Sequence, residues 1–114
     1  MKNFSIIFTL GSFFLFSCTR DKITPIDQQC NTTISFATDV LPIMEANCVS
    51  CHQPGNACGG YDLSTYTAIA ANANAIVGSM KANGYQLMPQ GGPALADSTI
   101  QKISCWIQQG KLDN

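Results

Sequence analysis

Charged side chains are scarce in this chain of 114 residues, which has six Lys and Arg against seven Asp and Glu. The basic residues form no cluster, whereas a nucleic-acid-binding surface needs a basic stripe. We therefore expect no nucleic acid among the partners. The sequence also offers no candidate general acid, general base or nucleophile, and we expect no enzymatic activity.

Histidine occurs once, as His52, so one copy of the chain cannot bind a metal through two histidines. Apolar and polar residues nowhere alternate for long enough to predict a strand, and the expected fold class is all-α. Without the apolar N-terminal segment, fewer than a hundred residues remain. A chain of that size has a modest core and usually needs a disulfide, a metal or a cofactor.

Long apolar runs are confined to the N-terminus. Lys2 precedes an apolar stretch over 4–16, which is too short to span a bilayer comfortably but long enough for a secretory signal. It ends in LFSC (15–18), which resembles the lipobox of bacterial lipoproteins. We predict a signal peptide over 1–17, lipidation of Cys18 and export to the bacterial periplasm or cell envelope as a membrane-tethered lipoprotein. The alternative is a signal peptide cleaved elsewhere, with Cys18 incidental.

Residues 18–34 are polar and contain Pro25, which predicts a tether, and residues 35–114 form the expected single domain. A first helix should run from Phe36 into Cys48, capped by Ser35 or Thr38. A second should open at 62–65 and end near Ala71, and a third, short helix should cover 75–81. Residues 82–96 are rich in Gly and Pro and predict a loop.

The C-terminal helix is the best marked. Asp97 or Ser98 is its expected N-cap, and Gly110 stands where a C-cap belongs. Its apolar stripe consists of Ile100, Ile103, Trp106 and Ile107. We expect Trp106 to pack in the core between the terminal helices.

Cys48-Val49-Ser50-Cys51-His52 is the c-type haem attachment pattern. Two cysteines separated by two residues can each add to one vinyl group of the same porphyrin, and the adjacent His52 can then present a ring nitrogen to the iron. The motif predicts one covalent haem c, attached through Cys48 and Cys51, with His52 as an axial ligand.

Three other interpretations of the motif compete. A zinc site would need a second Cys/His pair at finger spacing, which the sequence lacks. A thioredoxin-like redox pair would need a βαβ context. The two cysteines could also form a plain disulfide, with His52 a solvated neighbour.

Three methionines of the predicted domain are candidates for the other axial position. Met44 lies one turn before the motif on the same helix and should belong to the core. Met80 lies on a helical stretch and also fits a core position. Met88 is in the Gly/Pro-rich loop directly before Pro89, and a loop can cross the distal face of a haem. We therefore predict Met88 as the second axial ligand.

Residues 36–110 resemble class I-type monohaem cytochromes c, and more closely the small haem lipoproteins of that family. The matching pieces are CVSCH, GGYDLSTY (59–66), GYQLMPQGG (84–92) and the apolar stripe of the last helix. The resemblance implies three to five short helices around one covalent haem, with crossing terminal helices, His52 proximal and Met88 distal. Many members have a proline about a dozen residues after the His, whose carbonyl fixes the imidazole. This chain has Asp62-Leu63-Ser64 there, which leaves the partner of His52 open.

The resemblance also bears on the remaining cysteines. Relatives often bridge the last helix to the segment before the first helix, which favours a Cys30–Cys105 disulfide over Cys58–Cys105. In those relatives the second cysteine lies nearer the helix start, where this chain has Ser98.

His/Met ligation leaves no open position for a substrate, so we expect one-electron transfer. The expected partners are redox proteins that donate or accept electrons. The protein itself is expected to be a monomer or a subunit of a redox complex. The alternatives are a haem-based gas sensor, in which Met88 leaves the iron, or an accessory haem subunit of a larger redox complex. A third interpretation is a surface lipoprotein whose CVSCH pattern is incidental and holds a disulfide.

Overall fold

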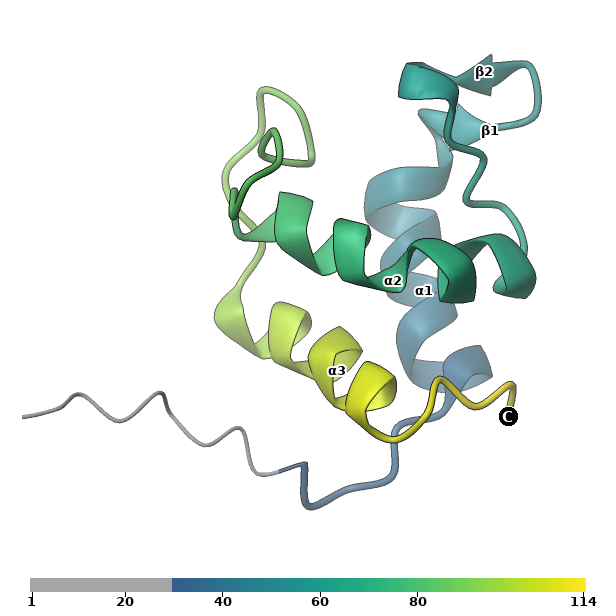
Figure 1. Ribbon diagram of the computed structural model, residues 1–114, viewed down its shortest axis with the longest axis vertical. Coiled ribbons are helices and arrows are strands. Elements are labelled where there is room, and N and C mark those ends of the chain that lie inside the picture. Colours follow the sequence, from purple (N-terminus) through teal and green to yellow (C-terminus); the bar gives the residue numbers. More distant parts are fainter. Residues whose placement is uncertain (1–29) are drawn as a thin grey trace, which may run out of the picture.

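The computed structural model describes residues 30–114, and helices predominate in them (Figure 1). The predicted signal peptide, Cys18 and the tether up to residue 29 lie outside these residues. The helical elements are η1 (Phe36–Val40), α1 (Leu41–Met44), η2 (Glu45–Val49), η3 (Cys58–Gly60), α2 (Tyr66–Met80) and α3 (Asp97–Gln108). No helix within 30–114 combines the length and the apolar character needed to cross a membrane.

The expected first helix is present as one continuous segment, 36–49, in which two π-helical turns, η1 and η2, flank α1. Ser35 is its N-cap, one of the two expected, and its Oγ accepts a hydrogen bond from the Thr38 N–H at 3.3 Å. The Asp39 carboxylate in turn accepts the Ser35 N–H at 3.1 Å. The two side chains thus satisfy the backbone N–H groups of Thr38 and Ser35, which no helical carbonyl reaches. We call residues 36–49 the first helical segment.

The expectation of two short helices over 62–71 and 75–81 is wrong, because α2 runs unbroken from Tyr66 to Met80. No proline or glycine interrupts 72–75. The side-chain amide of Asn72 donates a hydrogen bond to the Ala68 carbonyl of the same helix at 2.9 Å. Thr65 caps the helix, with Oγ1 accepting from the Ala68 N–H. Burial of Ile69, Ala73, Ile76 and Met80 outweighs the weak helix preference of asparagine.

The expected N-cap of α3 is also wrong. Ala96 occupies that position without a side-chain hydrogen bond, and Asp97 is already the first helical residue. In the first turn its carboxylate still interacts favourably with the positive end of the helix dipole. The C-terminal expectation is confirmed: Gly110 has a φ of 95° and follows the last turn. Its N–H donates to the Ile107 carbonyl and that of Lys111 to Trp106, the pattern of a Schellman motif.

The sequence predicted an all-α fold, and the structure adds a small antiparallel hairpin. Strand β1 (His52–Gln53) pairs with β2 (Asn56–Ala57) across Pro54-Gly55, and Gly55 has a φ of 84°. Strands of two residues are too short for an alternating pattern to appear in the sequence. The hairpin follows directly on the first helical segment and lies at one end of the molecule (Figure 1).

An aromatic cluster joins the helices in the core. The ring centroids of Phe36 and Tyr66 are 5.0 Å apart, and those of Phe36 and Trp106 are 5.6 Å apart. The three rings come from η1, α2 and α3, so this cluster fixes the start of the first helical segment against both other helices. Trp106 is fully buried, as expected, and its indole N–H donates to the Leu112 carbonyl at 2.9 Å.

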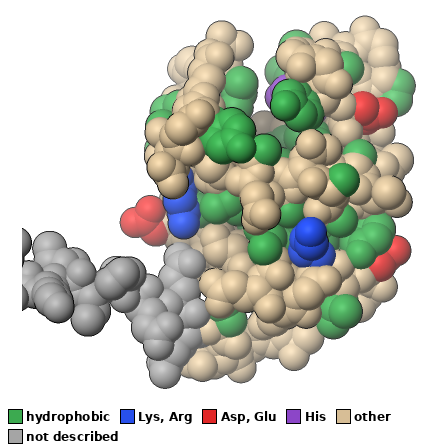
Figure 2. Space-filling model, viewed as in Figure 1, with side chains coloured by type: hydrophobic (Ala, Val, Ile, Leu, Met, Phe, Trp, Pro, Cys, Tyr) green, Lys and Arg blue, Asp and Glu red, His purple; other side chains and the backbone are tan. Residues whose placement is uncertain are grey.

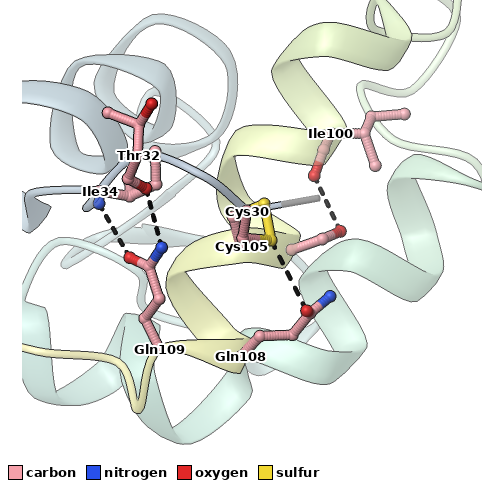
Figure 3. The surroundings of a disulfide bond; sticks show 8 residues. Cys30, Thr32, Ile34, Ile100, Cys105, Gln108 and Gln109 are labelled. Carbon is pink, nitrogen blue, oxygen red and sulfur yellow. Dashed lines mark hydrogen bonds between the residues drawn. A yellow bond between two sulfur atoms is a disulfide. The ribbon is translucent and has the colours of Figure 1, made fainter. Parts of the chain in front are cut away.

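A disulfide joins Cys30 to Cys105 on α3 (Figure 3). The side-chain amide of Gln109 reinforces this attachment, because it accepts the Ile34 N–H and donates to the Thr32 carbonyl, both at 2.8 Å. Residues 30–34, which the sequence placed in the tether, are therefore bound to the end of α3.

Candidate functional site

Cys48, Cys51 and His52 of the CVSCH motif lie on successive parts of the chain, from helix into hairpin. Cys48 lies buried near the end of the first helical segment, Cys51 is exposed in the turn that follows, and His52 begins β1. The Cys51 N–H donates to the Cys48 carbonyl at 3.2 Å, which turns the chain back on itself. All three side chains line one cavity of about 410 Å³. The motif therefore faces a hollow of cofactor size.

Five parts of the chain form the walls of this cavity, and one of them is the segment 58–63 with Cys58 and Leu63. The first helical segment and the hairpin lie on one side and the loop 82–96 on the other, and α2 runs across below them (Figure 1). Figure 2 shows the hollow between these two lobes, with histidine in purple at its wall. Apart from the motif, the lining includes Leu63, Ile76, Ser79, Met80, Met88, Pro89 and Leu95. Among the described residues, no Asp, Glu, Lys or Arg lines it, so the walls suit a largely apolar ligand.

The His52 imidazole is oriented by a backbone carbonyl. Its Nδ1 lies 3.2 Å from the carbonyl oxygen of Tyr61. A carbonyl can only accept, so this contact places the ring proton on Nδ1 and leaves the lone pair on Nε2 available to a metal. The Leu63 N–H donates to the His52 carbonyl at 2.7 Å and holds the same strand. Tyr61 thus provides the partner that the sequence left open.

The structure brings two methionines to the cavity. Met88 is half-buried in the loop 82–96, and its N–H donates to the Ser79 carbonyl at 3.1 Å, which fixes the loop to the end of α2. Met80 is buried in the core, as expected, yet its side chain also lines the cavity. Met44 is fully buried and lies outside the lining, in agreement with a core role.

A second hollow, of about 320 Å³, adjoins the first. His52, Cys58, Leu63 and Met88 line both, and the second one adds the exposed rings of Tyr61 and Tyr85 at its rim. The two hollows together therefore extend from the buried Cys48 to the protein surface.

The cysteines near the site differ in environment. Burial raises the pKa of the Cys48 thiol to about 11, so this thiol is neutral at physiological pH. Cys51 and Cys58 are exposed and unbridged, and both line the cavity. Cys105 pairs with Cys30, the first of the two pairings considered, and Cys58 stays outside that disulfide.

Within residues 30–114, no three His, Cys, Asp or Glu side chains are grouped so that they could bind a metal ion. The donor set around the cavity is therefore one imidazole, two thioethers and three thiols. Such a set fits a metal that brings its own equatorial ligands, as haem iron does.

Comparison of the chain with family models, with curated proteins and with solved structures finds no match in any of the three.

Proposed function

We propose that this protein is a monohaem c-type cytochrome that transfers single electrons. Cys48 and Cys51 would hold the haem covalently, and His52 and Met88 would be its axial ligands. The observation that carries the proposal is one cavity that is lined both by Cys48, Cys51 and His52 and by Met88. A bound haem would supply reversible one-electron chemistry at its iron.

The chain's own residues account for what such a haem would need. The Tyr61 carbonyl orients His52 and fixes its tautomer. The apolar walls would exclude water from the iron, and a thioether ligand favours the reduced form. Phe36 and Trp106 are in contact between the first helical segment and α3, which supports the crossing terminal helices of a cytochrome c-like fold.

The attachment can be tested directly in protein produced together with a haem-ligation system. The haem should stain after denaturing electrophoresis and resist acid-acetone extraction. Cys48→Ala and Cys51→Ala should each leave at most one thioether and shift the pyridine haemochrome band. Cys58→Ala is the matched control, because Cys58 lines the same cavity outside the motif, and it should leave the band in place. An unshifted band in both motif variants would refute the assignment.

A gas sensor would use the same residues, with Met88 leaving the iron to admit a ligand. This alternative draws support from the position of Met88 on a loop rather than on a helix. The reduced spectrum with and without carbon monoxide separates the two functions. A carrier should keep its spectrum, whereas a sensor should bind the gas.

We also propose that the protein is exported and held on a membrane by lipid at Cys18, and that its partners are redox proteins. The support is the apolar run that ends in LFSC. Cys18→Ala should leave the precursor unprocessed or release the protein. Finding the wild-type chain soluble, unmodified and cleaved at another residue would overturn this proposal.

A further inference from the structure

Cys58 is a third thiol at the site, and the haem proposal gives it no role. The hairpin explains its position. His52 pairs with Ala57 and Gln53 with Asn56, so the next pair outward along the same antiparallel ladder is Cys51 and Cys58. The Cys58 N–H donates to the Cys51 carbonyl at 3.0 Å, which continues the ladder by one hydrogen bond. The two cysteines therefore lie directly across the hairpin from each other.

This arrangement suits a disulfide. Hydrogen-bonded partners in an antiparallel ladder have Cα atoms about 5.5 Å apart, within the range of roughly 4.4–6.8 Å that disulfides span. Both thiols are unbridged and exposed, and both line the same cavity. Cys48, the other unbridged thiol, is 9% exposed and lies on the helical side of the turn. An oxidant in solution therefore meets Cys51 and Cys58 first.

We propose that Cys51 and Cys58 form a disulfide in the haem-free protein, which occupies Cys51 until it is reduced. Formation of this disulfide is independent of haem, whereas its effect on haem attachment rests on the proposed function. The reaction needs a disulfide oxidant such as oxidised glutathione. A bond forms between the Cys51 and Cys58 sulfurs while the S–S bond of glutathione breaks. The two cysteines lose two electrons and two protons, and two molecules of glutathione are released. Haem attachment at Cys51 would then require a reductant.

The test uses the full-length, haem-free protein. It is equilibrated with oxidised glutathione, denatured, treated with a thiol-alkylating reagent and analysed by tandem mass spectrometry. We expect alkylation of Cys48, with Cys51 and Cys58 protected until a reductant is added. The Cys30–Cys105 disulfide serves as the internal control for oxidation. Alkylation of Cys58 with a Cys48–Cys51 bridge, a Cys48–Cys58 bridge, or alkylation of both Cys51 and Cys58 would each overturn the proposal.

The two proposals fail separately. A negative haem stain refutes the cytochrome function but leaves the disulfide map unaffected, because the map is made without haem. A map that lacks the Cys51–Cys58 bond refutes this inference, while haem attachment to Cys48 and Cys51 would stand.

Discussion

Met80 and Met88 are alternative thioethers for one position, and they differ in how the chain holds them. Met88 lies on a loop and is half-buried, whereas Met80 is 2% exposed near the end of α2. Burial on a helix restricts the movement of the Met80 side chain, because core atoms surround it. The loop brings Met88 to the cavity, where its backbone N–H is bound to the Ser79 carbonyl and its side chain is only half-buried. Residue by residue, this favours Met88 as the ligand and Met80 as part of the wall.

We therefore expect different results from Met88→Ala and Met80→Ala in the haem-loaded protein. Met88→Ala should abolish the weak absorption band near the red end of the oxidised spectrum, lower the potential and let carbon monoxide bind the iron. Met80→Ala should keep the band and destabilise the fold by about 2–5 kcal/mol, since a buried side chain is lost. Spectra, potentiometry and denaturant unfolding of both variants make the comparison. Loss of the band in the Met80 variant alone would reverse the assignment.

The sequence identifies the CVSCH motif itself but not the backbone contacts that hold it in place. Cys48, Cys51 and His52 lie within five consecutive residues, so their spacing can be read directly from the sequence. The carbonyl of Tyr61 could not be predicted in the same way, because every residue has a carbonyl and only the fold selects one. The position of Cys58 opposite Cys51 could not be predicted from the sequence, because it depends on the register of the hairpin.

The start of the first helical segment depends on one carboxylate. Asp39 accepts the Ser35 N–H at 3.1 Å and forms an ion pair with Lys102 of α3 at 3.3 Å. The backbone hydrogen bond from Ser35 is the largest cause that holds the pKa of Asp39 below its ordinary value, and Lys102 adds to it. The charged carboxylate thus links an N-terminal cap to a contact between helices.

This arrangement predicts a pH-dependent effect of Asp39→Asn. The folded-state pKa is depressed, so the carboxylate stabilises the fold above its unfolded-state pKa, and that stabilisation is lost as pH falls through the folded-state value. We expect the variant to be less stable at neutral pH by up to about 1 kcal/mol, because the pair is partly exposed. The difference should disappear toward about pH 2. Denaturant unfolding across this range measures it, with Lys102→Met as a control that removes only the ion pair. A difference that is constant with pH would contradict this explanation.

Gly78 shows how α2 and the loop 82–96 fit together. A Cβ atom at Gly78 would lie 2.5 Å from Cδ2 and 2.7 Å from Cε2 of Tyr85, so the ring lies directly on the helix backbone. The Asn83 N–H donates to the Gly78 carbonyl at 2.9 Å and turns the chain into the loop. Glycine is therefore used inside this helix because it lets an aromatic ring of the loop approach closely.

Gly78→Ala would normally stabilise a helix interior by about 1 kcal/mol. Here we expect a smaller gain or a loss, since the ring of Tyr85 must move away. In a Tyr85→Ala background the same substitution should give the full helix-propensity gain. Unfolding free energies of the wild type, both single variants and the double variant form the double-mutant cycle. An equal effect of Gly78→Ala in both backgrounds would show that the ring contact has no energetic consequence.

At the level of elements, patterns that depend on neighbouring residues predicted well. The first helical segment, the loop 82–96 and the Gly110 stop of α3 agree with their expected positions. The division of α2 into two helices was wrong because packing of its buried face overrides the low propensity of the asparagines. The cap of α3 was displaced by one residue, since capping side chains are common in the first turn as well.

At the scale of the whole molecule, the two ends of the described chain are bound to each other. Asn114 accepts the Ala37 N–H through its backbone oxygen at 2.9 Å and the Phe36 N–H through its side chain at 3.0 Å. Tyr66 donates its hydroxyl to the Lys111 carbonyl at 2.7 Å. The cavity lies at the other end of the molecule, between the hairpin and the loop 82–96 (Figure 1). The aromatic cluster and these contacts form the rigid base from which both walls of the cavity extend.

The Cys30–Cys105 disulfide closes a long covalent loop in this base, because its cysteines are 75 residues apart in sequence. Such a cross-link chiefly limits the freedom of the unfolded chain, and its removal from a small domain costs about 2–5 kcal/mol. We expect Cys30→Ala to lower the unfolding free energy by that amount. Cys105 is 4% exposed, whereas Cys30 is half-buried, so Cys105→Ala should cost somewhat more through lost packing.

The matched control is the wild type under reducing conditions, which breaks the same bond without deleting atoms. It should unfold at nearly the same denaturant concentration as Cys30→Ala, and the reductant should not change the stability of that variant. Because the aromatic cluster and Asn114 still join the ends, the folded structure should persist, with an unchanged far-ultraviolet circular dichroism spectrum. Equal stability of the oxidised and reduced wild type would contradict this explanation, because it would mean that the disulfide gives no net stabilisation by limiting the unfolded chain.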